Sequence, residues 1–105
     1  MSTTANSSYV VKLGIVQMSC VANREVNVAN ALQQVDQLAA QGAQIVCLQE
    51  LFAGQYPCQA EDHRKFDEAE SIPGPTSQAL AATAERCGVV IVGSLFERRA
   101  PGVYH

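Results

Sequence analysis

The sequence contains neither a long hydrophobic run nor a strong excess of charge of either sign. No apolar stretch approaches the roughly 18–20 residues that a helix needs to span a bilayer. The chain has 7 Lys and Arg against 10 Asp and Glu, a formal net charge of −3. This balance gives no electrostatic reason to expect nucleic acid or an anionic membrane as a partner. Residues 1–8 have no basic segment followed by an apolar one, so they predict a disordered tail rather than a signal peptide, and a cytoplasmic protein.

Cysteine patterns typical of metal sites are also missing. Cys20, Cys47, Cys58 and Cys87 form no C-x-x-C pair and do not have the spacing of a zinc ribbon. Without a secretory signal, we expect the thiols to be reduced. Cys47 and Cys87 lie in apolar segments, where we expect them to pack as small hydrophobic side chains. The sequence therefore predicts no metal site and no cofactor.

The hydrophobic pattern predicts one α/β domain, or part of one, over residues 9–105. The chain has 105 residues, 48% of them hydrophobic and 16% charged, which is typical of a globular protein. Strands are expected over 9–18, 44–49 and 89–96. The first of these is apolar on both faces, which suits a strand covered on both sides. The chain order of strands and helices indicates right-handed crossovers and parallel pairing.

Two helices are expected between these strands. Asn23 can cap the first helix, and Gly42 ends it as a C′ glycine does. The second helix begins at Gly74 or Thr76 and ends at Gly88. A short helix is possible in the charged stretch around 61–65, and the dipeptide at 101–102 predicts a turn.

Glu50 is the candidate catalytic residue. It follows the apolar run 43–49 and precedes a loop that contains glycine and aromatic residues. Open α/β sheets usually carry their chemistry at this end of a strand. A carboxylate can act there as a general base, but it needs a nucleophile to serve, and none is evident before His105. By itself, Glu50 is better interpreted as a solvated carboxylate that ends a strand.

Five segments, in order and at family-like spacing, resemble the carbon–nitrogen hydrolases of the nitrilase superfamily. They are the first strand, the first helix, the segment that delivers the catalytic glutamate, the proline-rich turn and the following strand, at 11–18, 23–42, 44–52, 72–76 and 89–94. This resemblance covers 11–105. It implies an α/β fold that is the N-terminal part of a four-layer α-β-β-α sandwich, and a homo-oligomer at full length.

The resemblance implies a catalytic set of Cys, Glu and Lys, of which this chain supplies the glutamate as Glu50. Lys12, Lys65 and the four cysteines do not stand in the family's contexts. Tyr56 is carried over as a substrate-binding residue of the pocket wall, with ordinary loop packing as its alternative. His63 is better interpreted as a solvated residue of a charged patch.

Within the superfamily, residues 50–59, 95–99 and 102–105 look most like the N-carbamoylputrescine amidase branch. The resemblance implies hydrolysis of N-carbamoylputrescine to putrescine, carbon dioxide and ammonia, a reaction of polyamine biosynthesis, with a small-molecule carbamoyl-amine or amide as substrate. Two alternatives stay open. The chain is a catalytically incomplete fragment or interaction module, or it belongs to a related amidase or carbamoylase with another substrate.

Overall fold

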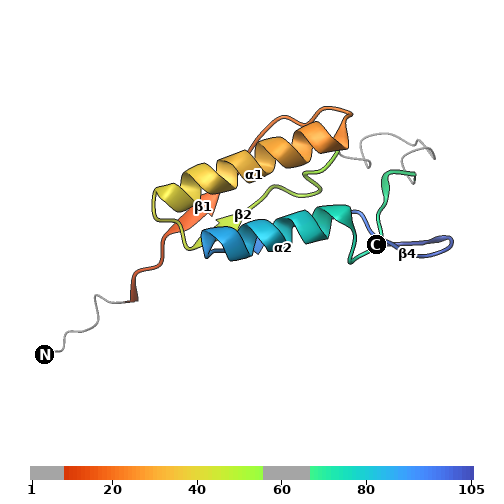
Figure 1. Cartoon of the computed structure of the whole chain (residues 1–105). Coiled ribbons are helices and arrows are strands. Elements are labelled where there is room, and N and C mark those ends of the chain that lie inside the picture. Colours follow the sequence, from red (N-terminus) through yellow and green to blue (C-terminus); the bar gives the residue numbers. More distant parts are fainter. Residues whose placement is uncertain (1–8, 56–66) are drawn as a thin grey trace, which may run out of the picture.

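The computed structural model describes residues 9–55 and 67–105. Its elements, in chain order, are β1 (Leu13–Ile15), α1 (Arg24–Ala40), β2 (Ile45–Cys47), α2 (Pro75–Cys87), β3 (Val90–Val92), β4 (Arg98–Ala100) and β5 (Val103–Tyr104). The first three strands form a parallel sheet in the order β1-β2-β3, and β4 pairs with β5 as an antiparallel hairpin. Both helices lie side by side over the sheet (Figure 1). The α/β prediction is confirmed, whereas the predicted tail at 1–8 and the possible helix at 61–65 lie outside the described residues.

The register of the sheet brings the carboxyl ends of all three strands to one edge. Ile45 pairs with Leu13 on one side and with Val90 on the other. The pairing continues one residue past β1 and β2, because the N–H of Val16 donates to the Cys47 carbonyl and the N–H of Leu48 to the Val92 carbonyl, each at 2.9 Å. Because parallel strands leave the sheet at the same edge, the segments that follow β1, β2 and β3 meet there.

Local signals in the sequence determine where the helices begin and end. The Asn23 side chain accepts the N–H of Val26 at 3.1 Å and caps α1. Gly42 follows the end of α1 with a φ of 97°, and Gly88 ends α2 with a φ of 67°. Gly74 is the N-cap of α2. Both predicted helices are confirmed, with their capping residues.

The core lies between the sheet and the two helices. Val16, Val35 and Val46 are at most 1% exposed and pack together. Ala31, one turn before Val35 on α1, is also fully buried. Full burial of a valine side chain contributes roughly 1.5–3 kcal/mol. This core therefore anchors β2, the central strand, from which the Glu50 loop departs.

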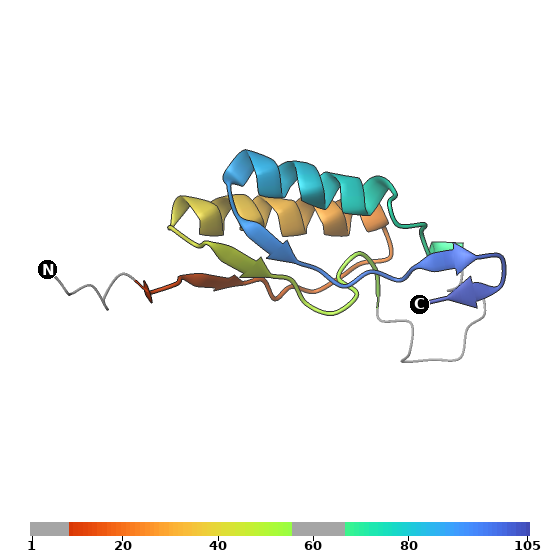
Figure 2. The same cartoon turned by 90° about the horizontal axis from the view of Figure 1, so that it is seen from below.

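Only one face of the sheet is covered by the described residues. In Figure 2 both helices lie on the same side of the strands. On the other side Leu13, Ile15, Val90 and Val92 are exposed by 52–74%. Within the described residues, the first strand is therefore covered on one face only, and its predicted cover on the second face stays a prediction. The apolar pattern shows which side chains suit burial, but a second layer has to be supplied by other residues.

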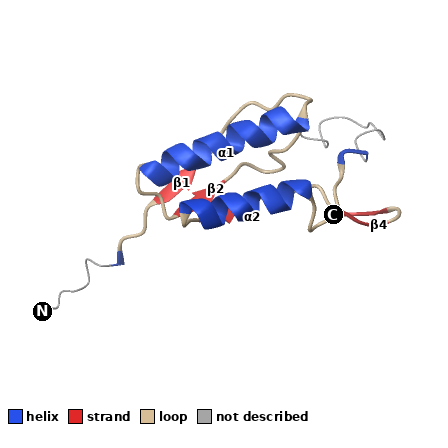
Figure 3. Cartoon of the chain, viewed as in Figure 1, coloured by secondary structure: helices blue, strands red, loops and turns tan. Residues whose placement is uncertain are grey.

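The strands are shorter than the predicted ranges of 9–18, 44–49 and 89–96. Each strand of the parallel sheet has three residues. Figure 3 shows loops and turns, drawn in tan, on much of the remaining chain between the helices and strands. After β3 the chain leaves the sheet, and Glu97 forms an isolated bridge with Glu70. The turn at 101–102 joins β4 to β5, as predicted. Strand length depends on the neighbouring strand, which an apolar pattern does not reveal.

Candidate functional site

Glu50 lies in a tight turn at the carboxyl edge of the central strand, three residues after β2. Its side chain is exposed. The next residue, Leu51, has a φ of 49°, a left-handed conformation that residues with a Cβ adopt at a cost of about 1–3 kcal/mol. Phe52 is fully buried and holds the turn against the core. The predicted place of Glu50 at a strand end is observed, and its catalytic role stays a prediction.

Two hydrogen-bonded side chains join this turn to the segment that follows β1. The Gln49 carboxamide accepts the N–H of Met18 at 2.7 Å and donates to the Cys20 sulfur at 3.3 Å. The Cys20 thiol donates to the carbonyl of Phe52 at 3.0 Å. Burial raises the pKa of Cys20, although the Gln49 bond opposes the shift. The thiol is therefore protonated at neutral pH and keeps the hydrogen that it donates.

Asn27 makes a third connection between the same two segments. Its side chain is fully buried on the first half of α1. Its Nδ2 donates to the carbonyls of Val21 at 2.7 Å and Ala53 at 3.1 Å, and its Oδ1 accepts the N–H of Val21 at 2.8 Å. These bonds satisfy a buried polar group that would otherwise be costly.

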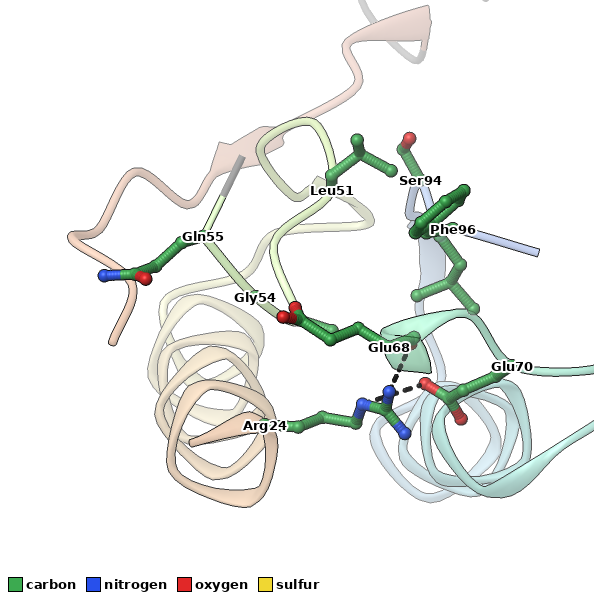
Figure 4. Close-up of a pocket in the computed structure, with 10 residues that line it drawn as sticks. Arg24, Leu51, Gly54, Gln55, Glu68, Glu70, Ser94 and Phe96 are labelled. Carbon is green, nitrogen blue, oxygen red and sulfur yellow. Dashed lines mark hydrogen bonds and ion pairs between the residues drawn. The ribbon is translucent and has the colours of Figure 1, made fainter. Parts of the chain in front are cut away.

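A small pocket adjoins the turn (Figure 4). It is lined by Arg24, Leu51, Ala53, Gly54, Gln55, Glu68, Glu70, Ser94, Leu95 and Phe96. Its volume of about 30 Å³ has room for a water molecule but not for an organic substrate. Glu50 is not part of its lining. Within the described residues, this pocket is therefore not a complete substrate site.

Two charged residues that line the pocket, Arg24 and Glu70, form an ion pair. Arg24 Nε lies 3.5 Å from Glu70 Oε2, and Arg24 also donates to the backbone carbonyl of Glu68. The Glu70 carboxylate, 9% exposed, accepts the backbone N–H and hydroxyl of Thr76 at 3.2 and 2.6 Å. Because its charge is already met by Glu70, Arg24 serves to join the two helices. Sequence reasoning missed this cluster, because its members are far apart in the chain.

Of the other residues weighed from the sequence, Lys12 can be placed, and it lies at the opposite edge of the sheet from Glu50. Lys12 lies just before β1 at the amino edge of the sheet, where its carbonyl accepts the N–H of Gln44 at 2.8 Å. Tyr56, His63, Cys58 and Lys65 lie outside the described residues. In the ranges 9–55 and 67–105, no three His, Cys, Asp or Glu side chains are placed to hold a metal ion. Neither described helix is long and apolar enough to cross a membrane.

Cys87 differs from its predicted role as a small hydrophobic side chain. Its thiol donates to Asp36 Oδ1 at 3.0 Å, and Arg86 lies 2.9 Å from the same oxygen. The bond to Asp36 raises the pKa of Cys87, and the bonds from Cys87 and Arg86 lower the pKa of Asp36. This polar contact joins α2 to α1 at the protein surface. Cys47, in β2, is half-buried.

Comparison with known proteins identifies the family. Residues 12–105 match the family described as "Carbon-nitrogen hydrolase". The chain is 37% identical over 94 residues to the "N-carbamoylputrescine amidase" of Solanum lycopersicum, covering 89% of this chain and 31% of the relative. It is 32% identical over 96 residues to the human "Omega-amidase NIT2", covering 90% and 33%. The chain thus spans about a third of the length of these relatives.

Solved structures agree with this assignment. A carbon–nitrogen hydrolase from Helicobacter pylori G27 matches with a TM-score of 0.83 and 30% identity, covering 90% of this chain and 33% of that one. Nit3 of Saccharomyces cerevisiae, a nitrilase superfamily member, shares the fold at a TM-score of 0.70 and 21% identity, covering 88% and 35%. The predicted nitrilase-like fold is confirmed. The chain belongs to the carbon–nitrogen hydrolase family.

Proposed function

We propose that this chain is the N-terminal portion of an enzyme that hydrolyses a non-peptide carbon–nitrogen bond, with Glu50 as its general base. The observation that carries the proposal is the place of Glu50. It is an exposed carboxylate at the carboxyl edge of the central strand, on a turn tied to the neighbouring segment. Parallel sheets present reacting groups at this edge.

The chemistry requires two further groups. A thiol attacks the carbonyl carbon as Glu50 takes its proton, and a lysine ammonium stabilises the charge that develops on oxygen. The C–N bond then breaks as that proton passes to the leaving nitrogen, and Glu50 activates the water that releases the acyl group from sulfur. No Lys or Cys of this chain stands in the corresponding family context. We propose that both come from sequence beyond His105, and that the 105 residues alone do not turn over substrate.

N-Carbamoylputrescine is the proposed substrate, hydrolysed to putrescine, carbon dioxide and ammonia. The proposal is supported by the resemblance of residues 50–59 and by the relatives named N-carbamoylputrescine amidase. Tyr56 is proposed to line the substrate pocket, and the full-length protein to form a homo-oligomer in the cytoplasm. The relatives named omega-amidase support a second candidate in which a linear amide replaces the carbamoyl-amine.

The test compares Glu50→Gln with Glu25→Gln in the full-length protein. Glu25 lies exposed in the first turn of α1 and provides a matched loss of charge. Ammonia release from N-carbamoylputrescine and from a linear ω-amide is measured for both. Loss of a general base lowers turnover by roughly 10²–10⁴-fold, whereas the control keeps wild-type turnover. Wild-type turnover by a folded Glu50→Gln protein would refute the assignment, and the preferred compound distinguishes the two substrates.

The exposed sheet face supports a function of another class. Leu13, Ile15, Val90 and Val92 form an apolar surface that a partner could cover. On this alternative the 105 residues are an interaction module without hydrolase activity. Turnover that depends on Glu50 in the full-length protein excludes this alternative.

A further inference from the structure

We propose that Asn27 is a positioning residue for Glu50. Its buried carboxamide ties the turn that carries Glu50 to the connection between β1 and α1. The inference rests on the proposed function of Glu50 as the base. Asn27 adds to that function by holding the Glu50 turn in place.

The hydrogen bonds enclose Glu50 from both sides in the sequence. Gln49, directly before it, bonds to Met18. Ala53, three residues after it, accepts a hydrogen bond from Asn27. Between these anchors the turn contains only a few residues, so the Glu50 backbone has little room to move.

Asn27 is suited to this role because one rigid side chain contacts both segments. It exchanges two hydrogen bonds with the backbone of Val21 in the β1–α1 connection and a third with Ala53 in the Glu50 turn. The side chain is fully buried and belongs to the 17-residue helix α1. Asn27 thus holds the turn at a fixed position relative to α1, which packs on the sheet. A general base that must contact a nucleophile from another segment needs a carboxylate held in a fixed position.

The strained backbone at Leu51 indicates that these hydrogen bonds are needed to keep the turn in its conformation. Leu51 holds a left-handed conformation with a φ of 49°. A turn with this conformation persists only where its surroundings impose it. The burial of Phe52 and the bonds from Cys20 and Asn27 supply that constraint. If these bonds are removed, the turn should relax and displace the Glu50 carboxylate.

The first test uses Asn27→Asp in the full-length enzyme, with Asn30→Asp as control. The aspartate keeps an acceptor for the Val21 N–H but loses both donors, and Asn30 is an exposed residue of the same helix. We expect kcat to fall by roughly 10²-fold, with KM changed by less than about threefold, because the base is displaced while substrate binding is retained. Hydrogen exchange should accelerate at residues 50–54 and stay unchanged in α2. The control should match wild type in both measurements.

A second pair of variants covers the case in which Asn27→Asp does not fold. Cys20→Ala removes the donor to the Phe52 carbonyl, whereas Cys20→Ser keeps one. We expect Cys20→Ala to lower kcat and accelerate exchange in the turn, and Cys20→Ser to restore both. Rescue by the hydroxyl is not expected if this contact only fills space.

The outcomes separate this inference from the proposed function. If Glu50→Gln abolishes turnover while Asn27→Asp, or Cys20→Ala where Asn27→Asp does not fold, leaves kcat and loop exchange unchanged, the positioning role is wrong. Uniform acceleration of exchange across the chain would also overturn it, since that marks a general loss of stability. If Glu50→Gln retains turnover, the proposed function fails, and the exchange data still report whether Asn27 holds the turn.

Discussion

The guanidinium of Arg24 and the carboxylate of Glu70 lie 3.5 Å apart, between Nε and Oε2, and join the first turn of α1 to the segment that leads into α2. The same carboxylate accepts two hydrogen bonds from Thr76 at the start of α2. A negative charge at a helix N-terminus is favourable, because the free N–H groups and the helix dipole point toward it. One side chain therefore connects both helices beside the pocket next to the Glu50 turn.

Replacing Glu70 should destabilise the fold in proportion to the number of hydrogen bonds and ion pairs that each substitution removes. Glu70→Ala removes the ion pair and both Thr76 bonds, and should lower the free energy of unfolding by roughly 2–4 kcal/mol. Glu70→Gln keeps an acceptor for Thr76 and should cost about 1 kcal/mol. Urea unfolding measures both, with Glu85→Ala on the exposed face of α2 as control. Equal midpoints for Glu70→Ala and the control would contradict this role.

The central strand should be the most sensitive part of the core. Val46 is fully buried in β2, whereas Val92 on β3 is 52% exposed. Val46→Ala removes two methyl groups from the close-packed layer and should cost about 2–3 kcal/mol. Val92→Ala should change stability by less than about 1 kcal/mol. Thermal or urea unfolding measures the stability of both variants. Similar losses of stability in the two would mean that the sheet face at Val92 is also buried.

The uncovered sheet face should make the 105-residue chain associate with itself when it is expressed alone. Exposed apolar sheet surface promotes such contacts. Ile15, 74% exposed, lies on this face, so Ile15→Lys should shift the chain toward monomer. Asn30→Lys adds the same charge to an exposed position of α1 and should not. Size-exclusion chromatography with light scattering measures the mass, and a monomeric wild-type chain would disprove this prediction.

The Cys87 thiol should become more reactive when Asp36 loses its charge. The bond to Asp36 raises the pKa of Cys87, because a carboxylate favours the protonated thiol. Asp36→Asn should therefore lower that pKa, increase the thiolate fraction at pH 8 and accelerate alkylation by iodoacetamide. Mass spectrometry follows the rate at Cys87, with Cys47 in the same sample as reference. An unchanged rate at Cys87 would show that the bond does not control its reactivity.

The same contact predicts how stability depends on pH. The pKa of Asp36 is lowered in the folded state by its bonds to Cys87 and Arg86. Its contribution to stability is therefore present above the usual Asp pKa and is lost as the pH falls through the lowered value. The raised pKa of Cys87 has the opposite consequence at alkaline pH, where stability is lost as the thiol ionises. Asp36→Asn should flatten both limbs of a stability profile measured by urea unfolding.

Much of the local structure follows from short-range signals in the sequence. Asn23 and Gly42 delimit α1, and Gly74 and Gly88 delimit α2, because capping depends on backbone groups within a few residues. The sequence also shows that Glu50 follows an apolar run, which predicts its place at the end of a strand. These features need no knowledge of distant contacts.

The remaining features depend on residues that are distant in the chain. The strands proved shorter than their apolar runs, because a ladder ends where its neighbour ends. Asn27 looked like any polar helical residue until its partner Ala53 was placed beside it. Likewise, the pairing of Arg24 with Glu70 is set by helix packing.

By itself, the sequence determined the order and class of the elements from β1 to β3, the helix boundaries and the family resemblance around Glu50, since these follow from periodicity, capping and short motifs, whereas the β4–β5 hairpin was not predicted. Only the tertiary structure decided which face of the sheet is covered, how short the strands are and which side chains hold the Glu50 turn. Those properties arise from hydrogen bonds and packing between segments tens of residues apart, and a pattern read along one chain does not specify such pairings.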